Sequence, residues 1–267
     1  MNFEDYAIEY SRKCNRCSGR RYVEEKEKMV ICPCQLKALI KYRYDEIPVS
    51  AKTKELDWTD FTGLIADKYM NVSNWKKSRD IAFGYCFSEK RAEELNMCDY
   101  SNDDIEDLMK HRISKSKIQD RLNEGSNLFI MGEEYSGKTL LASLIAREIV
   151  FYSVLKKDIY FKWISFHSLI NALSFNRIDY AFFDDITYTN DFLVLDNVFI
   201  PKQRNFMYNM LDELFYERSN KKKPIIVTGP FLNDDPITRE KLGNEIFRIY
   251  NNHKTNKIKL TLEKTNV

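Results

Sequence analysis

Short apolar runs that end in polar residues alternate with amphipathic stretches through the second half of this 267-residue chain. Runs of this kind predict buried parallel strands at residues 128–131, 159–164, 180–183 and 224–228. Helical patterns lie between or after them at residues 140–146, 166–173, 203–219 and 236–250. A period-2 alternation at 257–262 predicts a last edge strand. This order of elements indicates an α/β fold built on a parallel sheet.

The first half of the chain has a weaker pattern. We expect a short helix or an arm over residues 1–13 and a basic helix over 35–46, which Ile47-Pro48 ends. Residues 64–102 are rich in aromatic side chains and suggest short strands. An amphipathic helix over 103–124 is expected to end at Gly125.

Composition narrows the class of protein only slightly. The chain is 43% apolar and carries 42 basic against 40 acidic residues, a net charge of +2. Such a balance by itself indicates no nucleic-acid partner. No apolar run is long enough for a membrane span, and the acidic N-terminus lacks the plan of a signal peptide, so a cytoplasmic protein is expected.

The strongest motif is Gly132-Glu133-Glu134-Tyr135-Ser136-Gly137-Lys138-Thr139, which follows a predicted strand and precedes a predicted helix. In this context the pattern predicts a phosphate-binding loop whose backbone N–H groups point at phosphate oxygens. Lys138 is expected to contact the β- and γ-phosphates of ATP, and the Thr139 hydroxyl to ligate Mg²⁺. Glu133 and Glu134 are unusual in an anion-binding loop, and their side chains are expected to face solvent.

A second motif is the apolar run that ends in Asp184 and Asp185, 45 residues after the phosphate loop. We expect this run to be a strand that delivers both carboxylates to the edge of the sheet where the loop lies. Asp184 is then predicted to hold Mg²⁺ through water, and Asp185 to orient or deprotonate the attacking water. Thr228, at the end of a later strand, is a candidate sensor of the γ-phosphate. Residues 187–203 are interpreted as an insert.

Four of the six cysteines, Cys14, Cys17, Cys32 and Cys34, lie within 21 residues. Two closely spaced thiolate pairs can complete a tetrahedral zinc site, and the intervening residues are expected to form a hairpin that returns the second pair to the first. Four thiolates leave no open position for water, so the predicted role of zinc is structural. The alternatives are buried thiols, or a redox pair at Cys14 and Cys17.

Taken together, these motifs resemble the bacterial and phage replicative helicase loaders of the DnaC/DnaI type, which are AAA+ ATPases. The resemblance rests on the phosphate loop, Phe182-Phe183-Asp184-Asp185, Pro224-Ile225-Ile226-Val227-Thr228-Gly229 and the cysteine cluster. It covers roughly residues 10–63 and 120–255. The expected organisation is a zinc-binding module over 1–46, a linker or docking segment over 47–102, and a P-loop ATPase domain over 103–267.

The resemblance implies an ATPase that binds ATP, Mg²⁺ and single-stranded DNA and delivers a replicative helicase during replication initiation. It also implies self-assembly into a ring or spiral, in which Arg248 completes the site of a neighbouring subunit. Two departures stand out, because Gly229-Pro230 replaces the Ser-Asn that follows the sensor threonine in the family, and Arg248 comes one residue early.

Three other functions fit parts of the sequence. A nucleotide-dependent adaptor that binds the helicase without turnover fits the acidic loop and the missing sensor asparagine. An ATPase of the transposition-regulator (IstB-like) type fits the phosphate loop, although that family usually lacks a zinc module. A small-molecule P-loop kinase would need an arginine-rich lid after the loop.

Overall fold

The computed structural model describes residues 2–54, 56, 58, 72–88, 112–156, 159–174, 179–198, 205–230, 244–252 and 255–260. The helices and strands along the N-terminal part are α1 (Phe3–Arg12), β1 (Tyr22–Glu25), β2 (Lys28–Ile31), α2 (Pro33–Asp45), α3 (Ala51–Lys54), α5 (Val72–Cys86) and α7 (Ile118–Glu124). Those that follow are β3 (Leu128–Gly132), α8 (Lys138–Lys156), β4 (Phe161–Ser165), α9 (Phe166–Ser174), α10 (Tyr180–Asp184), a π-helical turn (Asp185–Thr189), β5 (Phe192–Asp196), α11 (Asn205–Asn220), β6 (Ile225–Gly229), α13 (Asn244–Asn251) and β7 (Asn256–Leu260).

Five of these strands form one parallel sheet in the order β4-β5-β6-β3-β7. This confirms the α/β class, the strands at the phosphate loop and before Thr228, and the edge strand near the C-terminal end of the described residues. Strands β3 and β6 are buried along their whole length, as expected where helices cover both faces of a parallel sheet.

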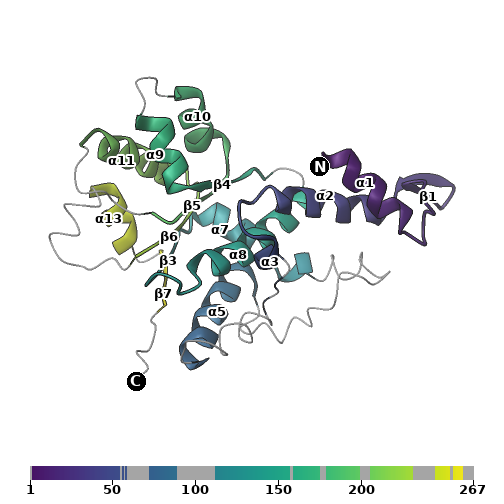
Figure 1. Cartoon of the computed structure of the whole chain (residues 1–267), viewed down its shortest axis with the longest axis horizontal. Coiled ribbons are helices and arrows are strands. Elements are labelled where there is room, and N and C mark those ends of the chain that lie inside the picture. Colours follow the sequence, from purple (N-terminus) through teal and green to yellow (C-terminus); the bar gives the residue numbers. More distant parts are fainter. Residues whose placement is uncertain are drawn as a thin grey trace.

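Successive side chains of β3 enter two different hydrophobic cores. Leu128 and Ile130 pack with residues of α5 and α8, whereas Phe129 and Met131 pack with residues of α9, α11 and α13. This alternation is the period-2 geometry of a strand covered on both sides. Figure 1 shows the result, with α5 and α8 on one face of the sheet and α9, α11 and α13 on the other.

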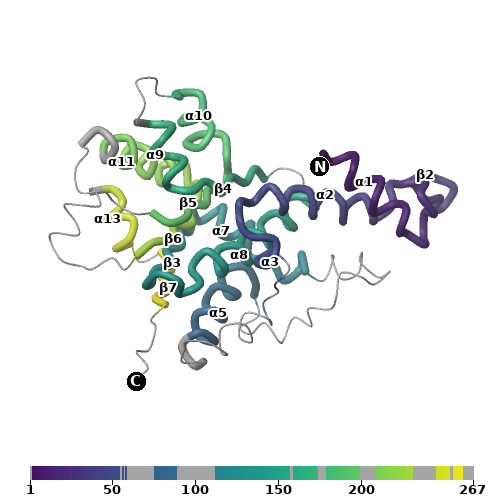
Figure 2. The backbone as a smooth tube through the Cα atoms, viewed as in Figure 1, coloured from purple at the N-terminus to yellow at the C-terminus, as the bar shows by residue number. Residues whose placement is uncertain are grey.

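The N-terminal residues form a small module that extends away from the sheet (Figure 2). The hairpin β1–β2 is antiparallel with Tyr22 opposite Ile31, and the helices α1 and α2 pack against each other. This confirms the predicted hairpin and both predicted helices. The module is joined to the rest of the chain through α2, whose Leu36 and Ile40 pack with Phe151 of α8.

Two expectations for the middle of the chain are corrected. The short strands predicted within residues 64–102 are replaced, in the described part, by the helix α5, which buries Trp75 and Phe83. The helix predicted over 103–124 is interrupted at Ser116, which pairs with Phe87 as an isolated bridge. It does end at Gly125, in the left-handed conformation (φ 65°) that favours glycine. Residues 103–111 lie outside the described residues.

The prediction of a strand ending in Asp184 and Asp185 is wrong. The stretch is helical because Asp179 caps it, accepting a hydrogen bond from the Phe182 N–H at 2.9 Å. The buried residues then follow helical spacing, at positions 183, 186, 187 and 190. The strand next to β6 is instead β5, with the sequence Phe-Leu-Val-Leu-Asp, inside the stretch that was interpreted as an insert.

A single buried arginine, Arg218 of α11, fixes the connection that leads into β5. Its guanidinium donates hydrogen bonds to four backbone carbonyl groups, those of Ile186, Asn190, Asp191 and Pro224. These carbonyls belong to the π-helical turn, the start of β5 and the start of β6. One side chain therefore satisfies the acceptors that the irregular backbone leaves unpaired.

A buried polar network around Glu148 of α8 holds segments from before the phosphate loop. Trp58 Nε1 donates to Glu148 Oε1 at 3.1 Å, and Arg112 Nε donates to Glu148 Oε2 at 2.9 Å. Arg147 Nη1 reaches the carbonyl of Leu56 at 2.8 Å. The network places Leu56 and Trp58 against the helix that follows the phosphate loop. No helix in the described ranges is long and apolar enough to cross a membrane.

We expect Glu148→Gln to lower the free energy of unfolding by about 3 kcal/mol, because the charge of buried Arg112 loses its carboxylate partner. Chemical denaturation followed by circular dichroism measures the change. Glu213→Gln on the exposed face of α11 is the matched control, with a change below about 0.5 kcal/mol. Equal stability of the Glu148 and Glu213 variants would contradict a structural role for the network.

Candidate nucleotide and metal sites

The phosphate loop connects β3 directly to α8, and its shape depends on two close approaches. A Cβ atom at Gly132 would lie 2.5 Å from both the Leu260 carbonyl oxygen and Ser136 Oγ, so only glycine fits there. Tyr135 and Gly137 both have left-handed backbone angles, φ 61° and 81°. Such a conformation is costly for tyrosine, yet its side chain is 94% exposed. The shape of the loop thus depends on the close approach at Gly132 and on the left-handed backbone at Tyr135 and Gly137, and not on packing of the Tyr135 side chain.

Several features of this loop suit an anion. Ser136 is fully buried, and its hydroxyl has no hydrogen-bond partner among the described residues. The first turn of α8 contains no acidic residue, so the positive end of the helix dipole is not neutralised. Glu133 and Glu134 are exposed, as predicted. Backbone N–H groups and a free buried hydroxyl at a helix start are the donors that a phosphate group requires.

Lys138, the first residue of α8, folds back over the loop. Its ammonium group donates hydrogen bonds to the carbonyl oxygens of Glu133 and Gly132, the latter at 3.0 Å. Burial lowers the pKa of Lys138, whereas the nearby carboxylates of Glu134 and Asp196 raise it. An ammonium group held at this point can exchange weak carbonyl contacts for charge-assisted hydrogen bonds to phosphate.

The acidic residue that meets the loop is Asp196, the last residue of β5. Its Oδ1 accepts a hydrogen bond from Thr139 Oγ1 at 3.0 Å and a second from Thr228 Oγ1 at 2.6 Å. The Thr228 hydroxyl in turn accepts a bond from the Asn197 N–H at 2.7 Å. Carboxylate and hydroxyl oxygens at the carboxyl edge of a parallel sheet are ligands of the type that Mg²⁺ prefers.

The structure therefore brings Lys138, Thr139 and Thr228 to Asp196, and not to Asp184. Asp184 and Asp185 lie in α10 and in the π-helical turn, where Asp185 is 3.7 Å from Lys162 of β4. Asp196 is not among the residues predicted from the sequence, although it follows the run Phe192–Leu195, which has the same apolar-then-acidic form.

Arg248, predicted to act on the site of a neighbouring subunit, lies on α13. Its guanidinium forms an ion pair with Glu245 at 2.8 Å on the same helix, and the side chain is 52% exposed. An exposed arginine of this kind is accessible to a second copy of the chain. The residues Leu242 and Gly243 that precede the helix lie outside the described part of the chain.

The four predicted zinc ligands come together in the N-terminal module. The Sγ atoms of Cys14, Cys17, Cys32 and Cys34 all lie within 4.8 Å of one another. Cys14 Sγ is 3.6 Å from Cys32 Sγ, and Cys17 Sγ is 3.7 Å from Cys34 Sγ. A tetrahedral site with Zn–S bonds of about 2.3 Å sets its sulfur atoms roughly 3.8 Å apart. The distances fit a four-thiolate metal site and are too long for disulfides.

Each cysteine pair is positioned by a different element. The backbone after the first pair turns through left-handed Ser18 and Gly19, and the second pair stands where β2 ends and α2 begins. Gln35 Nε2 donates to Cys34 Sγ at 3.4 Å and to the Ala7 carbonyl at 3.3 Å, which ties the cluster to α1. Hydrogen bonds of this type orient metal ligands. The remaining described cysteine, Cys86, is buried in α5.

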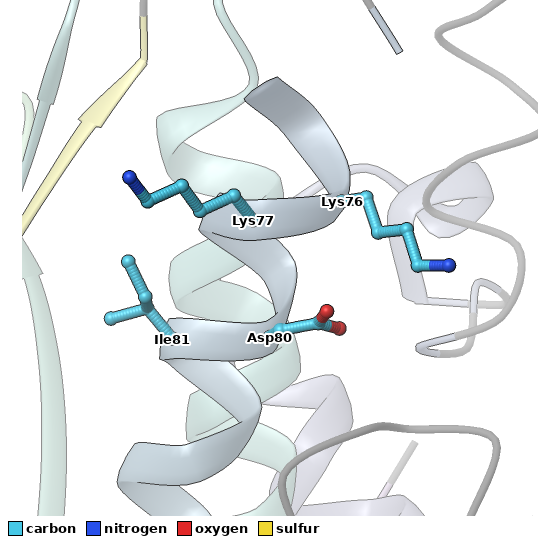
Figure 3. Close-up of a pocket in the computed structure, with 4 residues that line it drawn as sticks. All are labelled: Lys76, Lys77, Asp80 and Ile81. Carbon is cyan, nitrogen blue, oxygen red and sulfur yellow. The ribbon is translucent and has the colours of Figure 1, made fainter. Parts of the chain in front are cut away.

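A shallow pocket on α5 is separate from both sites. It is lined by Lys76, Lys77, Asp80 and Ile81 (Figure 3). All four residues come from one helix, and none belongs to the phosphate loop or the cysteine cluster. We therefore assign no role to this pocket.

Comparison with known proteins gives matches at the level of structure. No protein-family model matches the chain, and none of the curated proteins matches it. The crystal structure of the DnaC helicase loader is similar at 17% identity and a TM-score of 0.42, over 63% of this chain and 96% of that one. DnaI is similar at 13% identity and a TM-score of 0.46, over 81% of this chain and 95% of that one. AMPPCP-bound DnaA from Aquifex aeolicus is similar at 18% identity and a TM-score of 0.40, over 61% of this chain and about half (49%) of that one.

Proposed function

We propose that this chain is an ATP-dependent loader of a replicative DNA helicase. The observation that carries the proposal is the contact of Asp196 with both Thr139 and Thr228, which closes the phosphate loop onto the end of the sheet. The cysteine module at the N-terminal end of the same chain matches the motif order of the DnaC/DnaI type. Together they support a nucleotide-controlled protein with a separate partner-binding module.

In this proposal the phosphate loop and Lys138 hold the phosphates of ATP. Thr139 ligates Mg²⁺, and Asp196 takes the magnesium-associated role first predicted for Asp184. Thr228 is positioned to respond to the γ-phosphate, because its hydroxyl already bonds to the carboxylate that faces Thr139. When bound, Mg²⁺ supplies neutralisation of the phosphate charge.

Helix α8 offers a physical route from the nucleotide to the N-terminal module. Its first residue is Lys138, and its later turns contact α2, where Arg43 Nη1 lies 3.3 Å from Ser153 Oγ. Trp58 bonds to Glu148 between these two points. A shift at the start of this one rigid helix therefore reaches both the docking segment and the zinc module. The zinc module is the part that we propose grips the helicase.

The proposal includes two further interactions. Arg248 is exposed and available to complete the site of an adjacent copy, and such a head-to-tail contact generates a ring or an open spiral. Single-stranded DNA would be bound by backbone phosphate contacts within that assembly. ATP binding then holds the assembly, and loss of ATP from the site releases it.

We expect Asp196→Asn to weaken Mg²⁺-dependent ATP binding roughly 10- to 100-fold, the usual cost of losing a residue that supports a metal ligand. Isothermal titration with and without Mg²⁺ measures the change. Asp184→Asn is the matched control and should leave ATP affinity within about twofold. The reverse ranking of the two variants would restore the original assignment to Asp184.

Cys14→Ser should release most of the zinc and unfold the N-terminal module, because a small metal-dependent fold is lost with its metal. Zinc content by atomic emission and circular dichroism of the purified chain give the two readouts. Cys86→Ser is the control, since this buried cysteine lies outside the cluster and should keep zinc unchanged. Full zinc content in the Cys14 variant would rule out a four-thiolate site.

The test of the proposed function is capture of partners from the lysate of the natural host, with wild type and Lys138→Ala, each with and without ATP. Mass spectrometry should identify a hexameric replicative helicase, with recovery that depends on ATP for the wild type and not for the variant. Recovery of a transposase would favour the transposition-regulator type. Absence of a helicase in all four samples would overturn the loader proposal.

A further inference from the structure

The residue that follows Asp196, the carboxylate proposed to act with Mg²⁺, has an amide side chain. Strand β5 ends at Asp196, and the next residue, Asn197, is exposed at the carboxyl edge of the sheet. It is the next residue after the carboxylate that contacts Thr139. In the sheet, only β6 separates the strand that ends here from β3, the strand that leads into the phosphate loop. If ATP binds at the phosphate loop as proposed, this side chain stands at the edge of the sheet where the γ-phosphate and the attacking water would lie.

Hydrolysis of ATP requires that the attacking water lose a proton. As the water oxygen forms its bond to the γ-phosphorus, the bond from phosphorus to the β-γ bridging oxygen breaks, and the water must lose a proton to a nearby acceptor. A carboxylate can take that proton, but an amide cannot. Oδ1 of Asp196 is already engaged, since it accepts hydrogen bonds from both Thr139 and Thr228.

Three other carboxylates, those of Asp185, Glu133 and Glu134, are poorly placed for this step. Asp185, the predicted base, faces Lys162 in the π-helical turn. Glu133 and Glu134 belong to the loop that wraps the β- and γ-phosphates, whereas an in-line attack approaches from the side opposite the leaving oxygen. The ends of β4 and β6 offer Ser165 and Gly229, which are not bases.

The backbone at Asn197 would accept an acid without rearrangement. Its φ is 58°, in the left-handed region that Asn, Asp and Gly tolerate best. Its N–H donates to Thr228 Oγ1 at 2.7 Å, a bond that does not depend on the side chain. An acidic residue at position 197 would therefore fit the same backbone. This site lacks a base after Asp196 only because the side chain of Asn197 is an amide.

We propose that Asn197 makes the nucleotide site a slow-turnover switch, which holds Mg-ATP intact for longer than ATP takes to dissociate. The proposal rests on the proposed binding of ATP at the phosphate loop and adds how that site is regulated. Exchange of bound nucleotide, and not its hydrolysis, then resets the protein.

The test is single-turnover hydrolysis of radiolabelled ATP by wild type, Asn197→Asp and Asn197→Gly, with and without single-stranded DNA. Asn197→Asp should hydrolyse ATP at least about tenfold faster than wild type, since a positioned general base contributes about 10²- to 10⁴-fold. Asn197→Gly fits the same backbone angle, carries no carboxyl group and should show no such gain. Melting temperatures confirm that both variants are folded.

A second measurement on the unmodified protein keeps the inference testable if a variant fails to fold. Nucleotide released from wild type after one binding event should be mainly ATP. Release of mainly ADP, or equal rates for Asn197→Asp and Asn197→Gly, would overturn the inference. Failure of wild type to bind ATP at all would instead overturn the proposed function, so the two failures are distinguishable.

Discussion

The carboxylate of Asp196 is the point at which three segments that are far apart in the sequence meet. Thr139 comes from the first turn of α8, Thr228 from the end of β6, and Asp196 itself from β5 between β4 and β6. All strands of this sheet run parallel, so their carboxyl ends share one edge and their polar end residues are brought together. The phosphate loop, the acid and the hydroxyl group form one site only because of this constraint.

The rest of the chain holds that edge in place. Arg218 satisfies four carbonyl groups around the start of β5 and β6, which fixes where β5 begins and therefore where Asp196 ends it. On the opposite face, Glu148 ties Trp58 and Arg112 to α8. The same helix contacts α2 of the N-terminal module, so changes at the phosphate loop and at the module act on a shared element. This arrangement is a physical basis for coupling two distant sites.

Much of the molecule could be predicted from the sequence because the deciding interactions are local. The phosphate loop needs glycines, a lysine and a threonine at fixed spacing between a strand and a helix, and all of them are neighbours in the chain. The four cysteines lie close together in sequence. The hairpin between the two pairs has a two-residue turn, and it brings the second pair back to the first. Gly125 ends its helix for an equally local reason, its freedom to adopt a positive φ.

The assignment of the acidic residue was decided only by the tertiary structure. Two short apolar runs end in aspartate, and a run of four or five apolar residues fits a strand or a buried helix equally well. Asp179 caps the first run as a helix, and its residues Phe183 and Ile186 pack on one side only. The run Phe192–Leu195 gains hydrogen-bonded partners on both sides, from β4 and β6, and burial on both faces. The sequence by itself determined the phosphate loop and the group of four cysteines that could hold a metal. The competition between two similar runs for one place in the sheet determined which carboxylate meets Thr139 and Thr228.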